Sequence, residues 1–457
     1  MPQRKGPSCD RSARPFDPAA VFLAWGPQFL VQNNRDFAFT IIKIFSLIGN
    51  DNYKYFTSDG ITNSTVTLKQ AQMALDRGNL HGYHAWYLDE DGNEIPPPPK
   101  DDLIAYTSIF DSSKSLPGAL AGFLSNSRKG SRRQEIATYL SSKLYISPNT
   151  AHLLPKSKPR THINPYYDIW AWSCVALEWG GPFSGSTRCK IGHHILPILY
   201  HHFGCVVPSY SALWLIAQLA QPDKPKEPKN EKPKPDSKPK RKSKTILDIG
   251  SGSGYWTYAL RNLSLPSSMH PLHITPIDSL QSAYRTLWIP DTVVSDGPTY
   301  LENNNGGKDA EGGEDAILLL VYPPTGNRFT EKVIEAYKGD VIVIAGTQCG
   351  NGFTGFKDEG VEEWIRSRPG WDLCVRMPLP SFAGKDEGLF VWRRRRMGER
   401  SVGGKERKKK KRRGRKKKGY EVGNDKPKET TEEDMEAEAK EDTEGNADSD
   451  GDAHIYE

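Results

Sequence analysis

The stretch KTILDIGSGSGYW, residues 244–256, joins an apolar run to a set of alternating glycines. The run carries Asp248 near its end, and Gly250, Gly252 and Gly254 follow at every second position. Because glycine has no Cβ, the backbone can turn sharply here and come close to a ligand. A helix that begins just after the turn would offer unpaired N–H groups in its first turn. We therefore expect a strand, a ligand-binding turn and a helix, in that order.

The spacing of these glycines argues against a dinucleotide-binding turn. That fingerprint is G-x-G-x-x-G, which places a pyrophosphate over the turn. Counted from Gly250, the third glycine position holds Tyr255, and counted from Gly252 it holds Thr257. The pattern is instead D-x-G-x-G-x-G.

The sequence after residue 244 predicts an α/β fold. Near-continuous apolar runs alternate with stretches of helical spacing, which is typical of a parallel sheet covered on both faces. The connections are short enough for one doubly wound domain with right-handed crossovers. The expected strands are Thr245–Ile249, Leu272–Ile277, Thr292–Val294, Ala316–Val321, Val341–Ala345, Leu373–Met377 and Leu389–Trp392. The expected helices are Tyr255–Leu263, Ser279–Leu287, Thr330–Tyr337 and Val361–Arg366.

The glycine pattern after an apolar strand resembles motif I of the class I S-adenosylmethionine-dependent methyltransferases. The resemblance covers residues 245–396 and implies a doubly wound, seven-stranded, mostly parallel sheet of the Rossmann-like methyltransferase type. The segments 371–380 and 387–394 look like the antiparallel sixth and seventh strands that complete such a sheet. The implied cofactor is S-adenosyl-L-methionine.

The resemblance also implies which residues bind this cofactor. Asp278 ends the second strand, where a carboxylate can accept hydrogen bonds from both ribose hydroxyls, as in other Rossmann folds. Asp296 follows the third strand, where the resemblance implies a contact to the adenine amino group. The full expected set is Asp248, Gly250, Gly252, Gly254, Tyr255, Trp256, Asp278 and Asp296.

A narrower resemblance is to a little-characterised methyltransferase group with G-x-G-x-G-Y-W in motif I and Trp-Pro-Pro after the fourth strand. This chain has Tyr-Pro-Pro at the second place. The group implies that residues 161–221 are a helical segment attached to the core. The Lys/Pro-rich stretch 222–244 cannot bury a core and would then be a linker inserted at the surface. The group does not supply a substrate.

The candidate catalytic residues are Tyr322, Pro323 and Pro324. Methyl transfer from a sulfonium is an in-line displacement, so an enzyme mainly holds the reactants in position, and a base can help. Amino-methyltransferases of nucleic acids and of protein glutamine carry a polar residue, two prolines and an aromatic here. This chain departs from that pattern at Tyr322 and Thr325, which argues against simple amine specificity. We expect Tyr322 to line the acceptor pocket; the alternative is a core aromatic that closes the strand.

Charge is concentrated at the C-terminal end, although the whole chain has a formal net charge of only +6. Residues 393–418 carry 17 Lys and Arg against 2 Glu, and residues 419–457 carry 15 Asp and Glu against 3 Lys. We expect residues 397–457 to be a disordered tail, basic and then acidic. The basic block predicts a nuclear location through an import receptor, or contact with nucleic acid phosphates. A cytoplasmic location is the alternative.

The first 160 residues carry the weakest patterns. We expect a disordered leader over 1–20 and a mixed or helical N-terminal region of unknown role over 21–160. The elements expected in this region are helices at Thr67–Asn79 and Gln134–Leu144 and a hairpin at His84–Ile95. No apolar run reaches the ~20 residues of a membrane span, so we expect a soluble intracellular protein without a membrane partner.

Six His and Cys residues lie close together between positions 189 and 205. These residue types can bind zinc, but their spacing lacks the C-x₂-C anchor of common structural sites, and Pro197 interrupts a continuous helix. We therefore predict ordinary helix-surface histidines and no metal site, with zinc as the alternative. The residues are Cys189, His193, His194, His201, His202 and Cys205.

These patterns predict a methyltransferase that moves a methyl group from S-adenosylmethionine to an unidentified acceptor, which is a protein, an RNA or a small molecule. The alternative is a non-catalytic nuclear interaction protein that keeps a methyltransferase-like fold. The departures at Tyr322 and Thr325 and the long charged segments motivate that alternative.

Overall fold

The computed structural model of the chain describes residues 15–26, 30, 36–56, 65–78, 84–189, 192–222, 242–282, 284–302, 311–324, 328–348, 354, 356 and 359–395. These residues belong to one unit, Met1–Met397, and Gly398–Glu457 form a second unit. The charged tail and most of the predicted linker lie outside the described residues.

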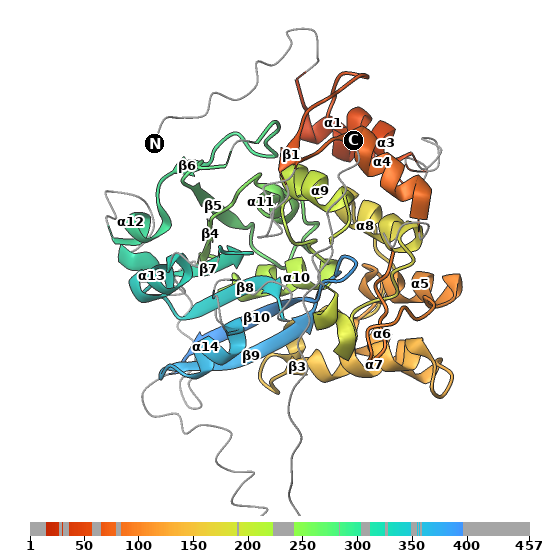
Figure 1. Ribbon diagram of the computed structural model, residues 1–457. Helices are drawn as coiled ribbons and strands as arrows, with labels where there is room; N and C mark the ends of the chain where they lie inside the picture. Colours follow the sequence, from red (N-terminus) through yellow and green to blue (C-terminus); the bar gives the residue numbers. More distant parts are fainter. Residues whose placement is uncertain are drawn as a thin grey trace, which may run out of the picture. The chain divides into compact units, whose positions relative to one another are not determined.

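An eight-stranded, mostly parallel sheet forms the centre of the first unit (Figure 1). Its strand order is β3-β9-β10-β8-β7-β4-β5-β6. Neighbouring strands are parallel from β6 to β8, and β10, β9 and β3 continue the sheet in antiparallel pairs. The strands are β3 (Tyr145–Ile146), β4 (Thr245–Ile249), β5 (His273–Asp278), β6 (Val293–Val294), β7 (Ala316–Val321), β8 (Val341–Thr347), β9 (Trp371–Pro378) and β10 (Glu387–Arg394). The predicted α/β class with a mostly parallel sheet is confirmed.

The sheet has eight strands where the sequence predicted seven. The additional strand, β3, comes from the N-terminal region and pairs with β9, with Tyr145 opposite Arg376 and Ile146 opposite Val375. A two-residue strand has no room for the alternating pattern by which strands are recognised in a sequence. The N-terminal region therefore contributes directly to the sheet.

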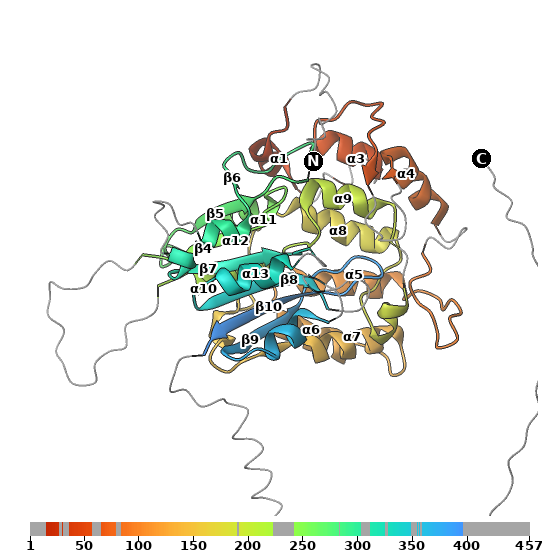
Figure 2. The same ribbon diagram turned by 60° about the vertical axis from the view of Figure 1, so that its left-hand side comes forward.

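Helices cover both faces of the sheet because side chains alternate along each strand. On β7, Ile317 and Leu319 belong to one hydrophobic core, whereas Leu318 and Leu320 belong to the other. Helices α8 to α11 contribute to the first core and α12 to α14 to the second (Figure 2). Their bounds are α8 (Pro165–Ala176), α9 (Ile195–Phe203), α10 (Tyr210–Leu219), α11 (Tyr255–Arg261), α12 (Gly297–Glu302), α13 (Phe329–Ala336) and α14 (Val361–Arg366).

The segment after β5 is not helical in its described residues, although the sequence predicted a helix over Ser279–Leu287. The Asp278 carboxylate accepts the main-chain N–H of Leu280 at 2.7 Å, and Leu280 has a left-handed backbone with φ 53°. A left-handed residue ends a right-handed helix, and a side-chain acceptor of this kind stabilises a turn instead. The described residues of 279–289 form an irregular strap, in which Trp288 and Ile289 are buried whereas Leu280 and Leu287 are exposed.

The N-terminal region packs against the same core as α8 to α11. Helix α1 begins inside the predicted leader, because Asp17 caps it by accepting the N–H groups of Ala19 and Ala20. Both predicted helices are present, whereas the predicted hairpin is reduced to one bridge between Leu88 and Glu94. The elements are α1 (Pro18–Ala24), α3 (Phe37–Ile44), β1 (Tyr55–Phe56), β2 (Thr65–Val66), α4 (Leu68–Arg77), α5 (Lys100–Thr107), α6 (Leu116–Ser125) and α7 (Arg132–Lys143). Within the described residues, none of the helices has the length and apolar character to cross a bilayer.

The two ends of the Lys/Pro-rich stretch lie side by side. The main-chain N–H of Lys244, just before β4, donates to the carbonyl oxygen of Ala220, just after α10, at 2.8 Å. The chain therefore leaves and re-enters the unit at adjacent points, so that the fold does not need the length of this stretch.

We predict that residues 223–241 can be replaced by a short Gly/Ser turn without loss of the fold. A shorter loop costs slightly less closure entropy, so the melting temperature should stay within about 3 °C of the wild-type value. Thermal unfolding followed by circular dichroism measures this. Loss of a cooperative transition in the shortened chain would contradict the arrangement.

Candidate functional site

The candidate site lies at the edge of the sheet where β4, β5, β7 and β8 have their carboxyl ends. These strands are parallel, and the antiparallel β10 starts at the same edge, with Glu387 opposite Thr347. Strand β4 lies between β5 and β7, where the chain order of the strands reverses. Ligands of open α/β sheets bind outside the strand ends at such a point. The turn that follows β4 occupies this place.

The turn after β4 is formed by three glycines with positive φ. The φ angles of Gly250, Gly252 and Gly254 are 78°, 56° and 80°, a region that favours glycine. The N–H groups of Gly250 and Ser251 donate to the carbonyl oxygen of Ile277 on β5, at 2.8 and 3.1 Å. The turn is therefore tied to the neighbouring strand and leads directly into α11.

The space around the three glycines differs. A Cβ added to Gly254 would lie 2.3 Å from Ile289, and one added to Gly252 would lie 2.9 Å from the Tyr284 hydroxyl. A Cβ on Gly250 would meet only the Phe329 ring, at 3.9 Å. Gly252 and Gly254 thus make room for the strap after β5. Among the described residues, open space for a ligand lies beside Gly250.

Asp278 holds the turn and still has acceptor capacity. One of its carboxylate oxygens accepts the N–H of Gly252 at 2.9 Å, and the other accepts that of Leu280 at 2.7 Å. Each carboxylate oxygen has a second lone pair, so a pair of ligand hydroxyls can be accepted as well. Leu280 itself is 43% exposed. No pattern in the sequence marked Leu280.

Two buried polar atoms beside the turn have no hydrogen-bond partner among the described residues. They are Asp248 Oδ1 and the Ser251 hydroxyl. The other Asp248 oxygen accepts a hydrogen bond from the Thr257 hydroxyl at 2.6 Å, and burial raises the pKa of Asp248 to about 6. Buried polar atoms nearly always have a partner, so the turn has unused capacity to bind a polar ligand or water.

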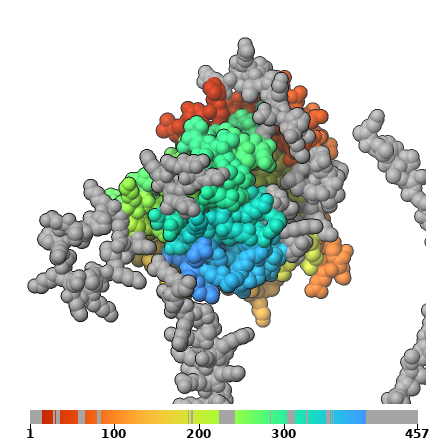
Figure 3. All heavy atoms as spheres, turned by 90° about the vertical axis from the view of Figure 1, so that its left-hand side faces the viewer, coloured from red at the N-terminus to blue at the C-terminus, as the bar shows by residue number. Residues whose placement is uncertain are grey.

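Asp296 lies at the start of α12 on the surface. Its carboxylate accepts hydrogen bonds from the main-chain N–H and the hydroxyl of Thr299, at 3.4 and 3.1 Å. Asp296 and Phe329 line an open hollow of about 590 Å³ between α12 and α13. Figure 3 views the face that carries these two helices, in green and cyan. Phe329 also borders the open side of Gly250, and the sequence did not mark it because it lies at a helix start.

Tyr255 and Trp256 are not at the open side of the turn. The Tyr255 hydroxyl donates to the side-chain oxygen of Asn164 at 2.7 Å, and the Trp256 indole donates to the carbonyl oxygen of Val206 at 2.8 Å. Both side chains are buried. Their side chains thus join α11 to the segment 161–221, and only their main chain remains available to a ligand.

Tyr322 follows β7 directly and has a left-handed backbone with φ 49°. Its N–H donates to the carbonyl oxygen of Ala345 on β8 at 2.7 Å, and its half-buried ring lies 6.4 Å from the ring of Tyr200. A bulky residue in this conformation costs about 1–3 kcal/mol, and such strain is concentrated at functional sites. Pro323 is buried and Pro324 is exposed, whereas Thr325 lies outside the described residues.

Some of the histidines and cysteines between positions 189 and 205 belong to the core. His202 is fully buried; its two ring nitrogens lie 2.9 Å from the Tyr55 hydroxyl and 3.2 Å from that of Thr286. Burial holds the pKa of His202 well below its usual range, so the ring is neutral. The prediction of surface histidines is wrong for His202 and for His193, which is also buried. In the part of the chain that the structure describes, no group of three or more His, Cys, Asp or Glu is placed to hold a metal ion.

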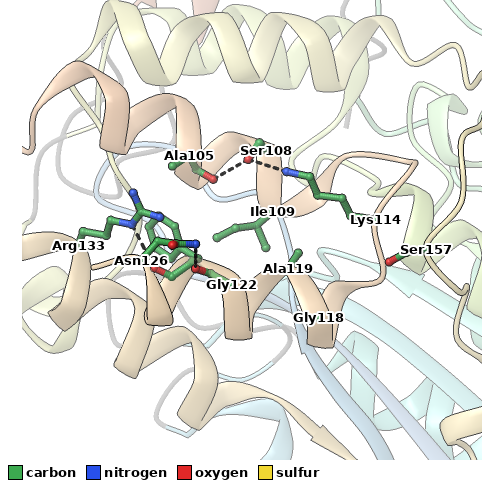
Figure 4. A pocket seen from close by; sticks show the side chains of 11 residues that line it. Ala105, Ser108, Ile109, Lys114, Gly118, Ala119, Gly122, Asn126, Arg133 and Ser157 are labelled. Atoms are coloured by element: carbon green, nitrogen blue, oxygen red, sulfur yellow. Dashed lines mark hydrogen bonds between the residues drawn. The ribbon is translucent and has the colours of Figure 1, made fainter. Parts of the chain in front are cut away.

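A second hollow, of about 350 Å³, lies among α5, α6 and α7 (Figure 4). Lys114 donates to the Ser108 hydroxyl at 3.0 Å, and Arg133 forms an ion pair with Asp102. None of the lining residues has a buried polar atom that lacks a partner. This hollow therefore shows less unused binding capacity than the edge of the sheet.

No protein-family model matches the chain, and no curated protein matches its sequence. The geometry at the carboxyl edge of the sheet is therefore the basis for a functional assignment. It combines an open turn at Gly250, the carboxylate of Asp278, and polar atoms without partners.

We predict opposite effects for two alanine substitutions in the turn. Gly254→Ala should destabilise the fold by several kcal/mol, because the new methyl group collides with Ile289 in addition to the positive φ. Gly250→Ala should cost only about 1–2 kcal/mol, because the space beside it is open. Urea unfolding of the two variants measures the difference. Equal stability losses would contradict the geometry of the turn.

Proposed function

We propose that this chain is an S-adenosylmethionine-dependent methyltransferase with a Rossmann-like core. The observation that carries the proposal is the turn after β4, which is open beside Gly250 and hydrogen-bonded through Gly252 to Asp278. Within residues 245–396 the strands lie in the order 3-2-1-4-5-7-6 by position in the chain, with the last two antiparallel. A mostly parallel sheet whose strand order reverses beside β4 supports the proposal.

The described residues fit the proposed cofactor. Asp278 would accept hydrogen bonds from the ribose hydroxyls, and Asp296 would accept one from the adenine amino group. Leu280 and Phe329 offer apolar surface for a flat base next to these carboxylates. The free Asp248 oxygen and the Ser251 hydroxyl would accept or donate hydrogen bonds beside the turn, directly or through water.

The acceptor would lie on the β7 and β8 side of the same edge. When bound, S-adenosylmethionine supplies a methyl group on a positively charged sulfur, which a nucleophile displaces in line. We propose that Tyr322, Pro323 and Pro324 form a rigid wall that positions this nucleophile. The hydrogen bond from the Tyr322 N–H to Ala345 fixes the wall against β8.

The alternative function, a nuclear interaction protein that has lost catalysis, rests on the charged segments. We also propose a nuclear location, because the block 393–418 carries 17 basic residues and can bind an import receptor or nucleic acid. This location is compatible with either function. Cofactor binding followed by methyl incorporation into a cell extract would distinguish them.

We predict that the full-length protein binds S-adenosylmethionine and that Asp278→Ala lowers the affinity on the order of 100-fold, because hydrogen bonds to a charged carboxylate are lost. Isothermal titration calorimetry measures both values. Asp291→Ala is the control. Asp291 is an exposed carboxylate that forms an ion pair with Arg261 at 2.8 Å, and Arg261 also donates to the carbonyl oxygen of Ile274 on β5. Absence of binding to the wild-type protein would contradict the proposed function.

We further predict that Tyr322→Ala lowers methyl transfer at least 10-fold while the cofactor affinity stays the same. Tyr322→Phe separates the ring from the hydroxyl, because it removes only the latter. Transfer of radiolabelled methyl groups into fractionated protein, RNA and small molecules is the measurement. Wild-type rates in both variants would exclude the side chain from the mechanism.

A further inference from the structure

Glu387 is a buried carboxylate without a partner at the same edge of the sheet. It is the first residue of β10, it is 1% exposed, and neither carboxylate oxygen accepts a hydrogen bond from a described residue. The nearby Ser381 hydroxyl donates its only hydrogen to the carbonyl oxygen of Leu379 and accepts the main-chain N–H of Glu387. Its one hydrogen can turn instead toward the Glu387 carboxylate, whose pKa it lowers, but it then satisfies at most one of the two oxygens.

The neighbouring residue Asp386, in contrast, is a buried carboxylate with hydrogen-bond partners. Its oxygens accept hydrogen bonds from the Tyr139 hydroxyl at 2.7 Å and the Gln348 amide at 3.3 Å. Burial raises the pKa of Glu387 to about 8, which the Ser381 hydroxyl and, less strongly, Lys385 oppose only in part. A native protein rarely keeps a buried ionisable group of this kind without a use for it.

A second unpartnered group lies close to Glu387. The hydroxyl oxygen of Tyr200 on α9 is buried and has no hydrogen-bond partner among the described residues. Burial raises the pKa of Tyr200, and the nearby Tyr322 and Glu387 raise it further. The ring of Tyr200 also lies between those of Tyr322, at 6.4 Å, and Phe382, at 5.9 Å. The ring contact with Phe382, which follows Ser381, places Tyr200 beside the segment that holds Glu387, and we call these two unpartnered groups the polar spot.

This polar spot is connected to the glycine turn. Glu387 raises the pKa of the Cys205 thiol, and Cys205 in turn raises that of Tyr284. The Tyr284 hydroxyl lies beside Gly252 of the turn. The ring contact between Tyr200 and Tyr322 and the pairing of Glu387 with Thr347 at the end of β8 place the two groups on the acceptor side of the proposed cofactor site.

We propose that Glu387 and Tyr200 bind the methyl acceptor, and that this acceptor is a nitrogen with at least two hydrogens, of the amine or guanidine type. This inference rests on the proposed methyltransferase function and names its substrate class. Two carboxylate oxygens require two donors, which such a nitrogen group supplies and a hydroxyl does not. The surrounding aromatic rings also favour a group that carries positive charge.

The pair would replace the amine-binding group that the chain lacks at Tyr322. In the transfer step, the nitrogen lone pair forms the bond to the methyl carbon, and the carbon–sulfur bond breaks with its electrons remaining on sulfur. Before the transfer, an oxygen of the Glu387 carboxylate accepts a proton from the bound ammonium or guanidinium group, which frees the nitrogen lone pair, and the carboxyl later releases this proton to solvent. The methylated nitrogen leaves with the positive charge that the sulfonium has lost. Glu387 is thus the base, and Tyr200 orients the nitrogen.

The first test is the stability of Glu387→Gln as a function of pH. The folded-state pKa of about 8 exceeds the ordinary value of 4.5, so the folded state keeps a proton that the unfolded state loses. Glu387 therefore lowers stability increasingly as the pH rises from about 4.5 to 8. The other titratable groups around it are Tyr106, Tyr166, Cys174, Tyr200, Cys205, Lys385 and Asp386, and they are unchanged in the variant.

We expect Glu387→Gln to melt on the order of 5 °C above the wild-type protein at pH 8.5, with a smaller gain at pH 5. In addition, n-butylammonium chloride should raise the wild-type melting temperature at pH 8.5 more than potassium chloride does, and should not do so in Glu387→Gln. Asp386→Asn is the matched control, which should keep the response to n-butylammonium. A variant that is less stable than wild type at every pH, or an absent n-butylammonium effect, would overturn the proposal.

The second test is methyl transfer by the full-length chain. We expect Glu387→Gln to lower transfer by about 100-fold or more, as for loss of a general base, with unchanged S-adenosylmethionine affinity. Tyr200→Phe should raise KM more than it lowers kcat, Asp386→Asn should retain transfer, and the labelled product should be N-methylated. Weakened cofactor binding in Glu387→Gln, or label on oxygen, sulfur or carbon, would overturn the inference about the acceptor but not the proposed methyltransferase function. Failure of the wild-type protein to bind the cofactor would instead contradict the proposed function, while the pH and n-butylammonium measurements still decide whether the pair binds an amine.

Discussion

The site depends on how the turn after β4 is held by β5. Three N–H groups of the turn are fixed by the neighbouring strand: those of Gly250 and Ser251 donate to the Ile277 carbonyl oxygen, and that of Gly252 donates to the Asp278 carboxylate. The same carboxylate also fixes Leu280, so one side chain sets both the turn and the strap that follows β5. Because only glycine adopts these backbone angles without strain, the three glycines are a requirement of the turn itself. The open space beside Gly250 is a consequence of this arrangement.

Polar atoms that have no partner among the described residues lie on both sides of this turn. Asp248 and Ser251 contribute them beside the glycines, and Tyr200 and Glu387 contribute them toward β10. Each such atom lowers the stability of the empty fold, since it has given up water without gaining a protein partner. The surrounding core, which extends from the N-terminal helices through α8 to α11 into the sheet, is large enough to tolerate this loss. A stability cost at a site is the usual consequence of preparing groups for a ligand.

Much of the sheet could be predicted from the sequence, because each central strand contains a short, mostly apolar run. The bounds of β4, β7 and α14 agree with the predicted runs, and the turn between β4 and α11 was found from glycine spacing alone. The helix predicted after β5 was wrong, because the hydrogen bond to the Asp278 carboxylate and the left-handed backbone of Leu280 override the helical spacing. The side chains of Tyr255 and Trp256 were expected at the ligand, but they form hydrogen bonds to Asn164 and Val206 instead. These partners are distant in the sequence, so no local pattern indicated them. Glu387 was not recognised at all, since a single acidic residue at a strand start carries no pattern until the fold buries it.

The most direct measurement is a crystal structure of the full-length protein with S-adenosylhomocysteine, the product of methyl donation. We expect the ribose hydroxyls to lie within hydrogen-bond distance of Asp278 and the ligand to run past Gly250, with its sulfur toward Tyr322. A structure in which the ligand binds elsewhere, or in which the space beside Gly250 is filled by the chain's own side chains at saturating ligand, would contradict this expectation.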